Sequence, residues 1–366
     1  RLFGVLDECL MPDRRLALVA APAGYGKTTL VAAWGESRAE GANLRLAWLS
    51  LDADDAGTAR FLRYLIAALQ RAEPGGALGE RASAMLAAPK PASPTAVLTA
   101  LINDLVHLDA RRASRRDARR RPRLVLVLDD YHVLEARDIH GAVTFLLEHL
   151  PPMLRVILVS RADPPLPLHR WRARRQIVEV RADDLRFNGE ETAAFLVESG
   201  VSGLSEKDTA ALTARTEGWP VGLQMAALAL QDRKTVDEKA RFIRDFSGNH
   251  RYVLDYLMAE VVSRQPPIVR RFLLVTSILD RLSAELCDAL VGHSKRAASP
   301  ATEAMGLDFA DASFASSQEI LEYLERAQLF LVPLDERRVW FRYHHLFAEL
   351  LRTRLRQMSP EHMRAY

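Results

Sequence analysis

Short apolar runs alternate with longer amphipathic segments over the first half of the chain. The runs have the length and composition of buried strands, and the segments between them repeat apolar residues at helical spacing. We predict strands at residues 16–20, 44–51, 124–130, 155–161 and 176–180. Strands that alternate with helices in this way favour a largely parallel sheet with helices on its faces, which is the α/β class.

From Leu185 onward the pattern becomes helical. Asn188 precedes one helical segment, and Ser205 is a typical N-cap residue of the next. Near the end of the chain, two apolar segments on either side of residues 335–338 predict a β-hairpin. A final helix is predicted over residues 344–356. Three helices and a hairpin in this order indicate a winged-helix domain.

A glycine loop joins the first predicted strand to a helix. Residues 21–29 read Ala-Pro-Ala-Gly-Tyr-Gly-Lys-Thr-Thr. Gly24 and Gly26 allow the backbone to turn its N–H groups toward phosphate oxygens, and the next helix presents its positive end to the same anion. We expect Lys27 to reach the β- and γ-phosphates and the Thr28 hydroxyl to ligate Mg²⁺.

One position departs from the usual pattern of a phosphate-binding loop (P-loop). Ala21 stands where the first glycine is common, and we expect the Gly-x-Gly-Lys-Thr core to hold the β-phosphate without it. A glycine turn with no ligand is the alternative, and the strand, the Lys-Thr pair and the helix together disfavour it. The residues expected to bind nucleotide in this loop are Gly24, Tyr25, Gly26, Lys27, Thr28 and Thr29.

Two other predicted strands end in charged residues. Asp129 and Asp130 follow a wholly apolar run, as expected of a central parallel strand that delivers carboxylates to its C-terminal edge. We expect Asp129 to hold Mg²⁺ and Asp130 to orient or deprotonate the attacking water. Arg161 ends the next strand, where a cation could sense the γ-phosphate or stabilise charge during its transfer. A surface arginine without a catalytic role is the alternative.

Composition restricts the class of protein further. The 366 residues are 49% hydrophobic and 27% charged, which predicts a soluble globular protein of two or three domains, and no apolar run approaches a membrane span. Cys9 and Cys287 are isolated, which fits a cytoplasmic protein and excludes a cysteine zinc site. The arginine-rich run at residues 111–123 is either an acidic-partner or nucleic-acid patch or a solvated loop. Its lack of interleaved aromatic residues favours the loop.

Taken together, these motifs resemble the nucleotide-switch module of STAND ATPases, and within them the MalT-like, large LuxR-type transcription regulators. The matching stretches are residues 22–30, 128–132, 158–161, 218–220 and 341–347. They follow the family's order over nearly the whole chain. The resemblance implies an α/β P-loop domain of the AAA/STAND type, then a small helical domain and a winged-helix domain. We place these at residues 1–182, 183–249 and 250–366.

The same resemblance implies two further ligands of ATP or ADP. Pro220, in Gly-Trp-Pro, takes the family's role of packing against adenine. His344 takes the role of the winged-helix histidine that contacts the ADP β-phosphate. In related ATPases an acid follows this histidine, and here His345 replaces it, which leaves the hydrogen bonding of this corner open.

The function implied is a switch with slow ATP hydrolysis. ADP would hold a closed resting state, and ATP together with an inducer would open the module and allow self-association. Regulators of this type carry an inducer sensor and a helix-turn-helix DNA-binding domain C-terminal to the module, and we expect both beyond Tyr366. Two alternatives are a defence or signalling STAND ATPase with a different effector, and an AAA-type motor with rapid turnover.

Overall fold

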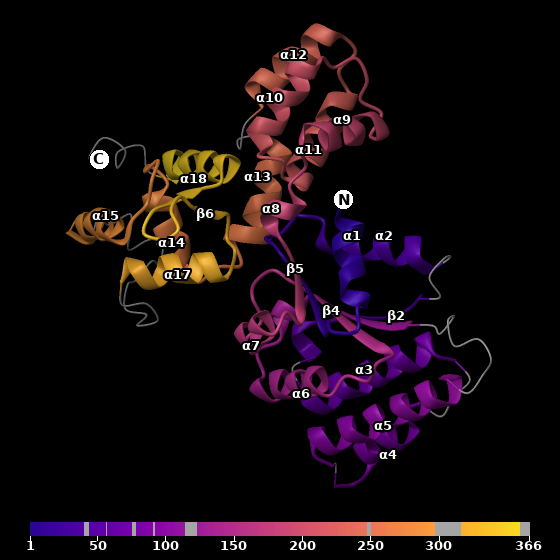
Figure 1. Cartoon of the computed structure of the whole chain (residues 1–366). Coiled ribbons are helices and arrows are strands. Elements are labelled where there is room, and N and C mark those ends of the chain that lie inside the picture. The colour runs from indigo at the N-terminus through magenta and orange to yellow at the C-terminus, as the bar shows by residue number, and fades with distance from the viewer. Residues whose placement is uncertain are drawn as a thin grey trace. The chain divides into compact units, whose positions relative to one another are not determined.

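The computed structural model describes residues 1–39, 44–55, 57–74, 78–90, 92–113, 123–246, 250–296 and 316–358. The chain divides into two compact units (Figure 1). The first unit comprises Arg1–Ala21 and Gly26–Asp184, and the second comprises Pro22–Tyr25 and Leu185–Tyr366. Part of the glycine loop therefore belongs with the second unit. The predicted division into three domains stays a prediction.

The first unit contains a five-stranded parallel sheet with the strand order β2-β3-β4-β1-β5. The strands are β1 (Leu16–Ala20), β2 (Leu44–Ser50), β3 (Arg123–Asp129), β4 (Leu154–Ser160) and β5 (Ile177–Arg181). Every residue of β1 and β4 is buried, as expected of central strands covered on both faces. The predicted parallel α/β fold is therefore confirmed, with each strand boundary within one residue of its expected position.

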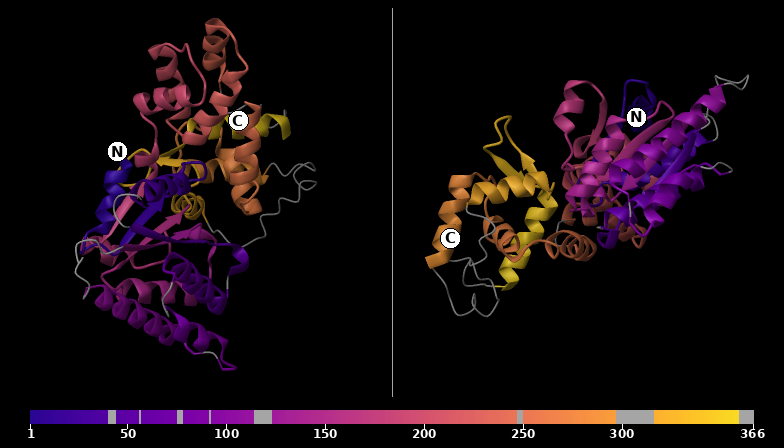
Figure 2. Two further views of the ribbon diagram at one scale, coloured as in Figure 1. Left: turned by 90° about the vertical axis from the view of Figure 1, so that its right-hand side faces the viewer. Right: turned by 90° about the horizontal axis from the view of Figure 1, so that it is seen from below.

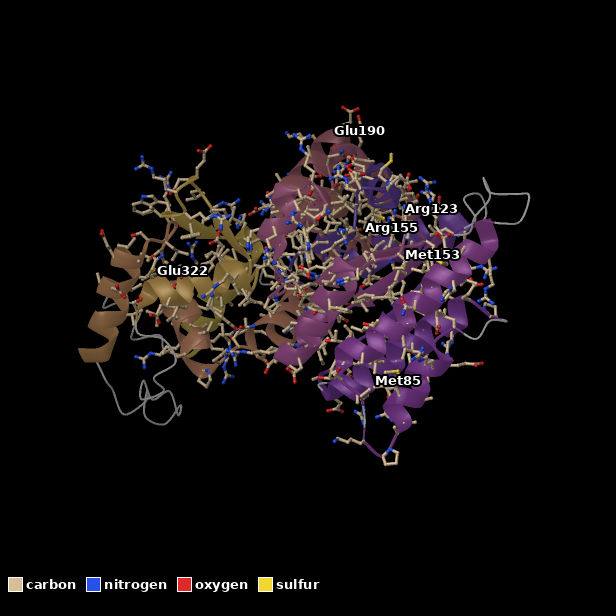
Figure 3. The ribbon with its side chains drawn as sticks, turned by 60° about the horizontal axis from the view of Figure 1, so that its bottom comes forward. Met85, Arg123, Met153, Arg155, Glu190 and Glu322 are labelled. Carbon is tan, nitrogen blue, oxygen red and sulfur yellow. The ribbon has the colours of Figure 1, made fainter. Side chains whose placement is uncertain are left out.

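The first unit also contains helices, several of which pack on this sheet. They are α1 (Leu2–Asp7), η1 (Glu8–Leu10), α2 (Lys27–Ala39), η2 (Ala53–Asp55), α3 (Thr58–Ala72), α4 (Glu80–Ala87), α5 (Pro94–Ala113), η4 (Tyr131–Val133), α6 (Arg137–Glu148), α7 (Leu168–Ala173) and α8 (Ala182–Leu185). The short α4, which lies among glycines and prolines in the sequence, was not expected. The buried Met153, which precedes β4, belongs to the hydrophobic core, and Met85 of α4 packs against this core; both are labelled in Figure 3. The arginine-rich run lies largely outside the described residues, because α5 ends at Ala113 and β3 begins at Arg123.

The second unit is mainly helical. Its elements are α9 (Gly189–Glu198), α10 (Glu206–Thr216), α11 (Pro220–Gln231), α12 (Val236–Asp245), α13 (Arg251–Leu257), η5 (Met258–Val262, a π-helix), α14 (Pro267–Thr276), α15 (Ala284–Arg296), α17 (Ser317–Arg326), β6 (Leu331–Pro333), β7 (Phe341–Tyr343) and α18 (His345–Met358). Asn188 and Ser205 form capping boxes at α9 and α10, as their sequence positions predicted. A third capping box, Thr235 with Glu238, begins α12. That helix was not predicted, although its Thr-x-x-Glu signal is visible in the sequence.

The hairpin β6–β7 is antiparallel and is drawn in yellow in Figure 2. Leu282 extends it, since this residue exchanges two backbone hydrogen bonds of 2.8 and 2.9 Å with Phe341. The predicted hairpin and final helix are confirmed. The helix α15 continues to Arg296, and residues 297–315 lie outside the described part of the chain. Both cysteines of the sequence, Cys9 and Cys287, are buried thiols.

Candidate nucleotide-binding site

The glycine loop has the backbone that its sequence predicts. Gly24 and Gly26 have φ angles of +77° and +72°, in the left-handed region that favours glycine. Lys27 begins α2, and the N–H of Leu30 donates to the carbonyl oxygen of Gly26 at 2.8 Å. The strand, loop and helix order required of a phosphate-binding loop is therefore present.

Lys27 lies in an environment that suits an anion. Its side chain is buried, with 8% of the residue exposed. Burial, and after it the positive charge of Arg161, lower the pKa of Lys27 to about 8, while the carboxylates of Asp130 and Asp129 oppose this shift. A phosphate next to Lys27 would favour the charged ammonium and raise its pKa again.

Asp129 and Thr28 meet at the carboxyl end of β3. The Thr28 hydroxyl donates to Oδ1 of Asp129 at 3.1 Å, and the N–H of Asp130 donates to the same oxygen at 3.0 Å. Burial, followed by the neighbouring charge of Asp130, raises the pKa of Asp129. A hydroxyl and a buried carboxylate held together in this way are the oxygen ligands that Mg²⁺ prefers.

Asp130 differs from Asp129 in both backbone and exposure. Its φ is +56°, a left-handed conformation that costs a non-glycine residue about 1–2 kcal/mol. Its side chain is about half exposed, at 51%. Strained backbone at a strand end is common where a side chain has a catalytic task, which is consistent with the predicted role of Asp130 but does not test it.

Arg161 follows β4, the strand that lies between β3 and β1 in the sheet. Ala20 at the end of β1 is in register with Ser160, the residue before Arg161. The carboxyl ends of parallel strands lie at one edge of a sheet, which is where open α/β sheets bind ligands. The structure therefore brings together Lys27, Thr28, Asp129, Asp130 and Arg161, all of the first unit.

In the second unit, the first half of the loop is held by the start of α11. Nε1 of Trp219 donates to the carbonyl oxygen of Ala23 at 3.2 Å, and the N–H of Val221 donates to that of Gly24 at 3.1 Å. A Cβ on Gly24 would lie 2.9 Å from Trp219 Nε1 and from Val221 Cβ. Pro220, the residue that the family resemblance assigns to adenine, is the first residue of α11. Its fully buried neighbour Trp219 was missed as a loop-binding residue.

His344 precedes α18 and is 1% exposed. Nε2 lies 3.2 Å from the carbonyl oxygen of Thr216, which can only accept, so Nε2 carries the proton. The other ring nitrogen, Nδ1, is buried and has no hydrogen-bond partner among the described residues. Burial lowers the pKa of His344 to about 4, against the opposing charge of Glu217. The ring is therefore neutral at pH 7, with Nδ1 as an acceptor.

Glu217 supplies a carboxylate close to His344. It accepts two hydrogen bonds from the guanidinium of Arg342, at 2.8 and 2.9 Å, and one from the N–H of His345 at 2.9 Å. Burial by itself raises the pKa of Glu217, but the hydrogen bond from Arg342 and the other contacts lower it to about 2. Glu217 of the helical segment thus places a carboxylate beside His344. In the family pattern an acid follows the histidine directly, and in this chain His345 replaces that acid.

Comparison with known proteins agrees with this geometry. Residues 1–159 match the AAA ATPase domain family, and residues 258–363 match the MalT winged helix domain family. The chain is 34% identical over 341 residues, 93% of its length, to the HTH-type transcriptional regulator MalT of Serratia proteamaculans (strain 568). It is 33% identical over 341 residues to MalT of Yersinia pestis (strain Pestoides F). The chain is a MalT-like P-loop ATPase module.

The MalT-like module covers 33% of the length of each of these relatives. Its fold is similar to that of a Walker-type ATPase of Pyrococcus abyssi, with a TM-score of 0.60 over 96% of this chain and 94% of that one, at 12% identity. Among the helices of the described residues, none is long and apolar enough to cross a lipid bilayer.

Proposed function

We propose that the MalT-like module is an ATP- and ADP-dependent switch of a transcription regulator. ADP holds a closed resting state, and ATP with an inducer opens the module and leads to self-association. The proposal rests on the two hydrogen bonds that join the start of α11 to the P-loop. Since Trp219 and Val221 bind the carbonyl oxygens of Ala23 and Gly24, a change in the loop on nucleotide exchange acts directly on the second unit.

The residues of the first unit fit a magnesium nucleotide. Lys27 binds the β- and γ-phosphates, while Thr28 and Asp129 hold Mg²⁺, which neutralises charge on the phosphates when bound. The hydrogen bond between Thr28 and Asp129 holds both oxygens close together, where they could ligate Mg²⁺. Gly24, Tyr25, Gly26 and Thr29 complete the loop.

Hydrolysis is slow in this proposal and returns the switch to ADP. Asp130 orients the water, and Arg161 stabilises charge on the γ-phosphate, close enough to Lys27 to affect its pKa. An AAA-type motor needs rapid turnover, so rapid steady-state ATP hydrolysis in the absence of an inducer would contradict the switch.

In this proposal, Pro220 and His344 are the residues of the second unit that contact ADP. Pro220 packs on adenine, and His344 contacts the β-phosphate. Because the neutral His344 ring carries its proton on Nε2, it can keep its bond to Thr216 and also donate to a phosphate oxygen only if Nδ1 gains a proton. ADP binding is therefore linked to proton uptake.

The deciding experiment is to identify the nucleotide that co-purifies with the module and then to exchange it. We expect ADP with a compact monomer, and larger particles by light scattering once ATP and an inducer replace it. Since a sensor for the inducer is proposed for the whole regulator, the full-length protein is the material for the inducer arm. Co-purified ATP in a compact monomer would contradict the ADP resting state.

A further inference from the structure

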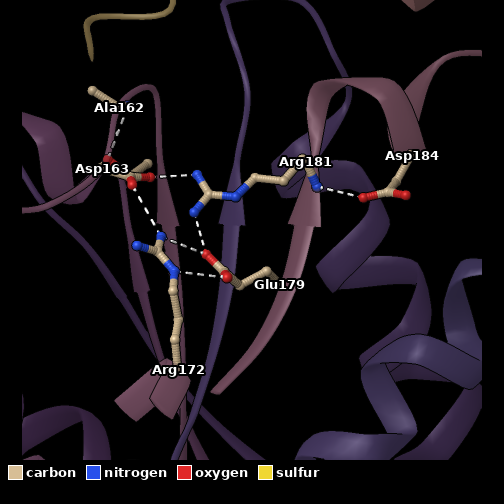
Figure 4. Close-up of polar contacts among 7 residues, drawn as sticks. Ala162, Asp163, Arg172, Glu179, Arg181 and Asp184 are labelled. Atoms are coloured by element: carbon tan, nitrogen blue, oxygen red, sulfur yellow. Dashed lines mark hydrogen bonds and ion pairs between the residues drawn. The ribbon is translucent and has the colours of Figure 1, made fainter. Parts of the chain in front are cut away.

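Four side chains of alternating charge form a closed network on the first unit (Figure 4). The Asp163 carboxylate accepts hydrogen bonds from Arg181 and from Nη2 of Arg172, the latter at 3.2 Å. Arg172 also donates to both oxygens of Glu179, at 3.0 and 2.9 Å, and Arg181 donates to the same Glu179. Each guanidinium thus bridges two carboxylates, and each carboxylate bridges two guanidiniums.

Three members of this network stand on regular structure, and one does not. Glu179 and Arg181 belong to β5, and Arg172 belongs to α7. Asp163 alone lies in the segment that follows β4. The backbone N–H of Arg181 also donates to Asp184 at 2.8 Å, at the start of α8 (Figure 4). The network therefore binds the segment after β4 to β5, which is an outermost strand of the sheet.

This segment carries Arg161. On one side of Arg161, the N–H of Ala162 donates to the buried hydroxyl of Ser160 at 3.3 Å. On the other side, two residues later, Asp163 is bound by two arginines. Arg181 is in register with Ala20, where β1 ends and the P-loop begins. The backbone from Arg161 to Asp163 thus lies at the carboxyl ends of the strands, where the phosphate site is predicted.

We propose that Asp163 is a positioning residue that sets the place of the Arg161 guanidinium through this four-membered network. The inference rests on the proposed role of Arg161 in ATP hydrolysis. Isolated ion pairs at a surface contribute little, but paired, bridging guanidinium contacts fix geometry. Arg161 must meet charge that develops in the transition state, so a small displacement of its backbone affects the reaction more than nucleotide binding.

The test compares Asp163→Asn with the parent module. Asn keeps the side-chain shape but loses the charge that holds both arginines. We expect single-turnover ATP hydrolysis to slow by about tenfold, with ADP affinity unchanged within about twofold and the same melting temperature. Asp163→Glu keeps the charge and should recover most of the rate. Glu148→Gln is the matched control, because it removes a 3.7 Å ion pair to Arg170 on the same α7 and should hydrolyse ATP at the parental rate.

A double-mutant cycle separates positioning from a general structural role. If Asp163 acts through Arg161, adding Asp163→Asn to Arg161→Ala should slow hydrolysis no further than Arg161→Ala alone. Additive losses, or a parental rate for Asp163→Asn, would overturn the inference. A parent module that binds no nucleotide, or binds ATP without hydrolysing it, would instead overturn the proposed function itself.

Discussion

The indole nitrogen of Trp219 donates to the carbonyl oxygen of Ala23, across 196 residues of sequence. This bond and the one from the N–H of Val221 to Gly24 both use carbonyl oxygens of the P-loop, whereas phosphate is bound by N–H groups. The first half of the loop is therefore bound to the start of α11 through carbonyl oxygens, which are not the groups that bind an anion.

Trp219→Phe should weaken ADP binding without unfolding the chain. Phe keeps the ring packing on Phe330 and His344 but cannot donate to Ala23. A neutral hydrogen bond contributes about 0.5–1.5 kcal/mol, so we expect ADP affinity to fall about threefold to tenfold by calorimetry. Trp34→Phe is the control, because it removes an indole bond of 3.0 Å to Asp7 elsewhere. Equal affinities in both variants would show that the Trp219 bond does not shape the loop.

Lys27→Ala should abolish most nucleotide affinity. The charge-assisted contacts that Lys27 makes with phosphate are worth about 1.5–3 kcal/mol, so ADP and ATP affinities should fall at least about tenfold. Lys207→Ala, at an exposed position on α10, is the control and should bind as the parent does. Parental affinity in Lys27→Ala would remove the P-loop from the proposed site.

Asp130→Asn and Asp129→Asn should have different effects. Asp130→Asn should retain magnesium ATP and slow its cleavage, because only the group that orients water is lost. Asp129→Asn should weaken binding that depends on Mg²⁺, measured by titration with and without the metal. Asp138→Asn, exposed on α6, controls for the loss of a carboxylate. If both variants cleave ATP at the parental rate, the end of β3 is not the catalytic strand end.

His344 should make ADP affinity depend on pH. In the chain without ADP, burial lowers the pKa of His344 to about 4, so the ring is neutral between pH 6 and 8. If the β-phosphate draws a proton onto Nδ1, the bound ring has a higher pKa, and ADP affinity should rise as the pH falls from 8 to 6. Calorimetry in two buffers of different ionisation enthalpy counts the protons taken up.

His344→Gln supplies the background for this measurement, since ADP itself titrates in the same range. His344→Ala should also release ADP faster and populate the open or self-associated form, while His345→Ala should do so less. A charge-assisted bond of about 1.5–3 kcal/mol corresponds to roughly tenfold to a hundredfold in the ratio of closed to open forms. Equal proton uptake in the parent and His344→Gln would show that the ring stays neutral.

The sheet and the first-unit site were predictable because their signals are local. The strands β3 and β4 are short apolar runs whose charged residues, Asp129 and Arg161, stand at or directly after the strand end. Parallel pairing then collects the strand ends at one edge, so residues far apart in sequence meet without further information.

Contacts of the second unit depend on packing that no local pattern records. Glu217 adopts a φ of +49° and pairs with Arg342, which is 125 residues away. In sequence, Glu217 is one more acid at the end of a helix, and Trp219 is the middle residue of a Gly-x-Pro motif. Their partners depend on the fold of the whole unit, and in this segment the family resemblance had pointed only to Pro220.

The two cysteines make the chain convenient for chemical labelling. Cys9 and Cys287 are 1% and 0% exposed, and burial raises the pKa of each thiol to about 12, so neither offers a reactive thiolate to a maleimide at neutral pH. The natural sequence therefore behaves as cysteine-free toward such dyes. One exposed cysteine added to each unit would carry a donor and an acceptor fluorophore, and the energy transfer between them would follow opening in real time as ADP is exchanged for ATP.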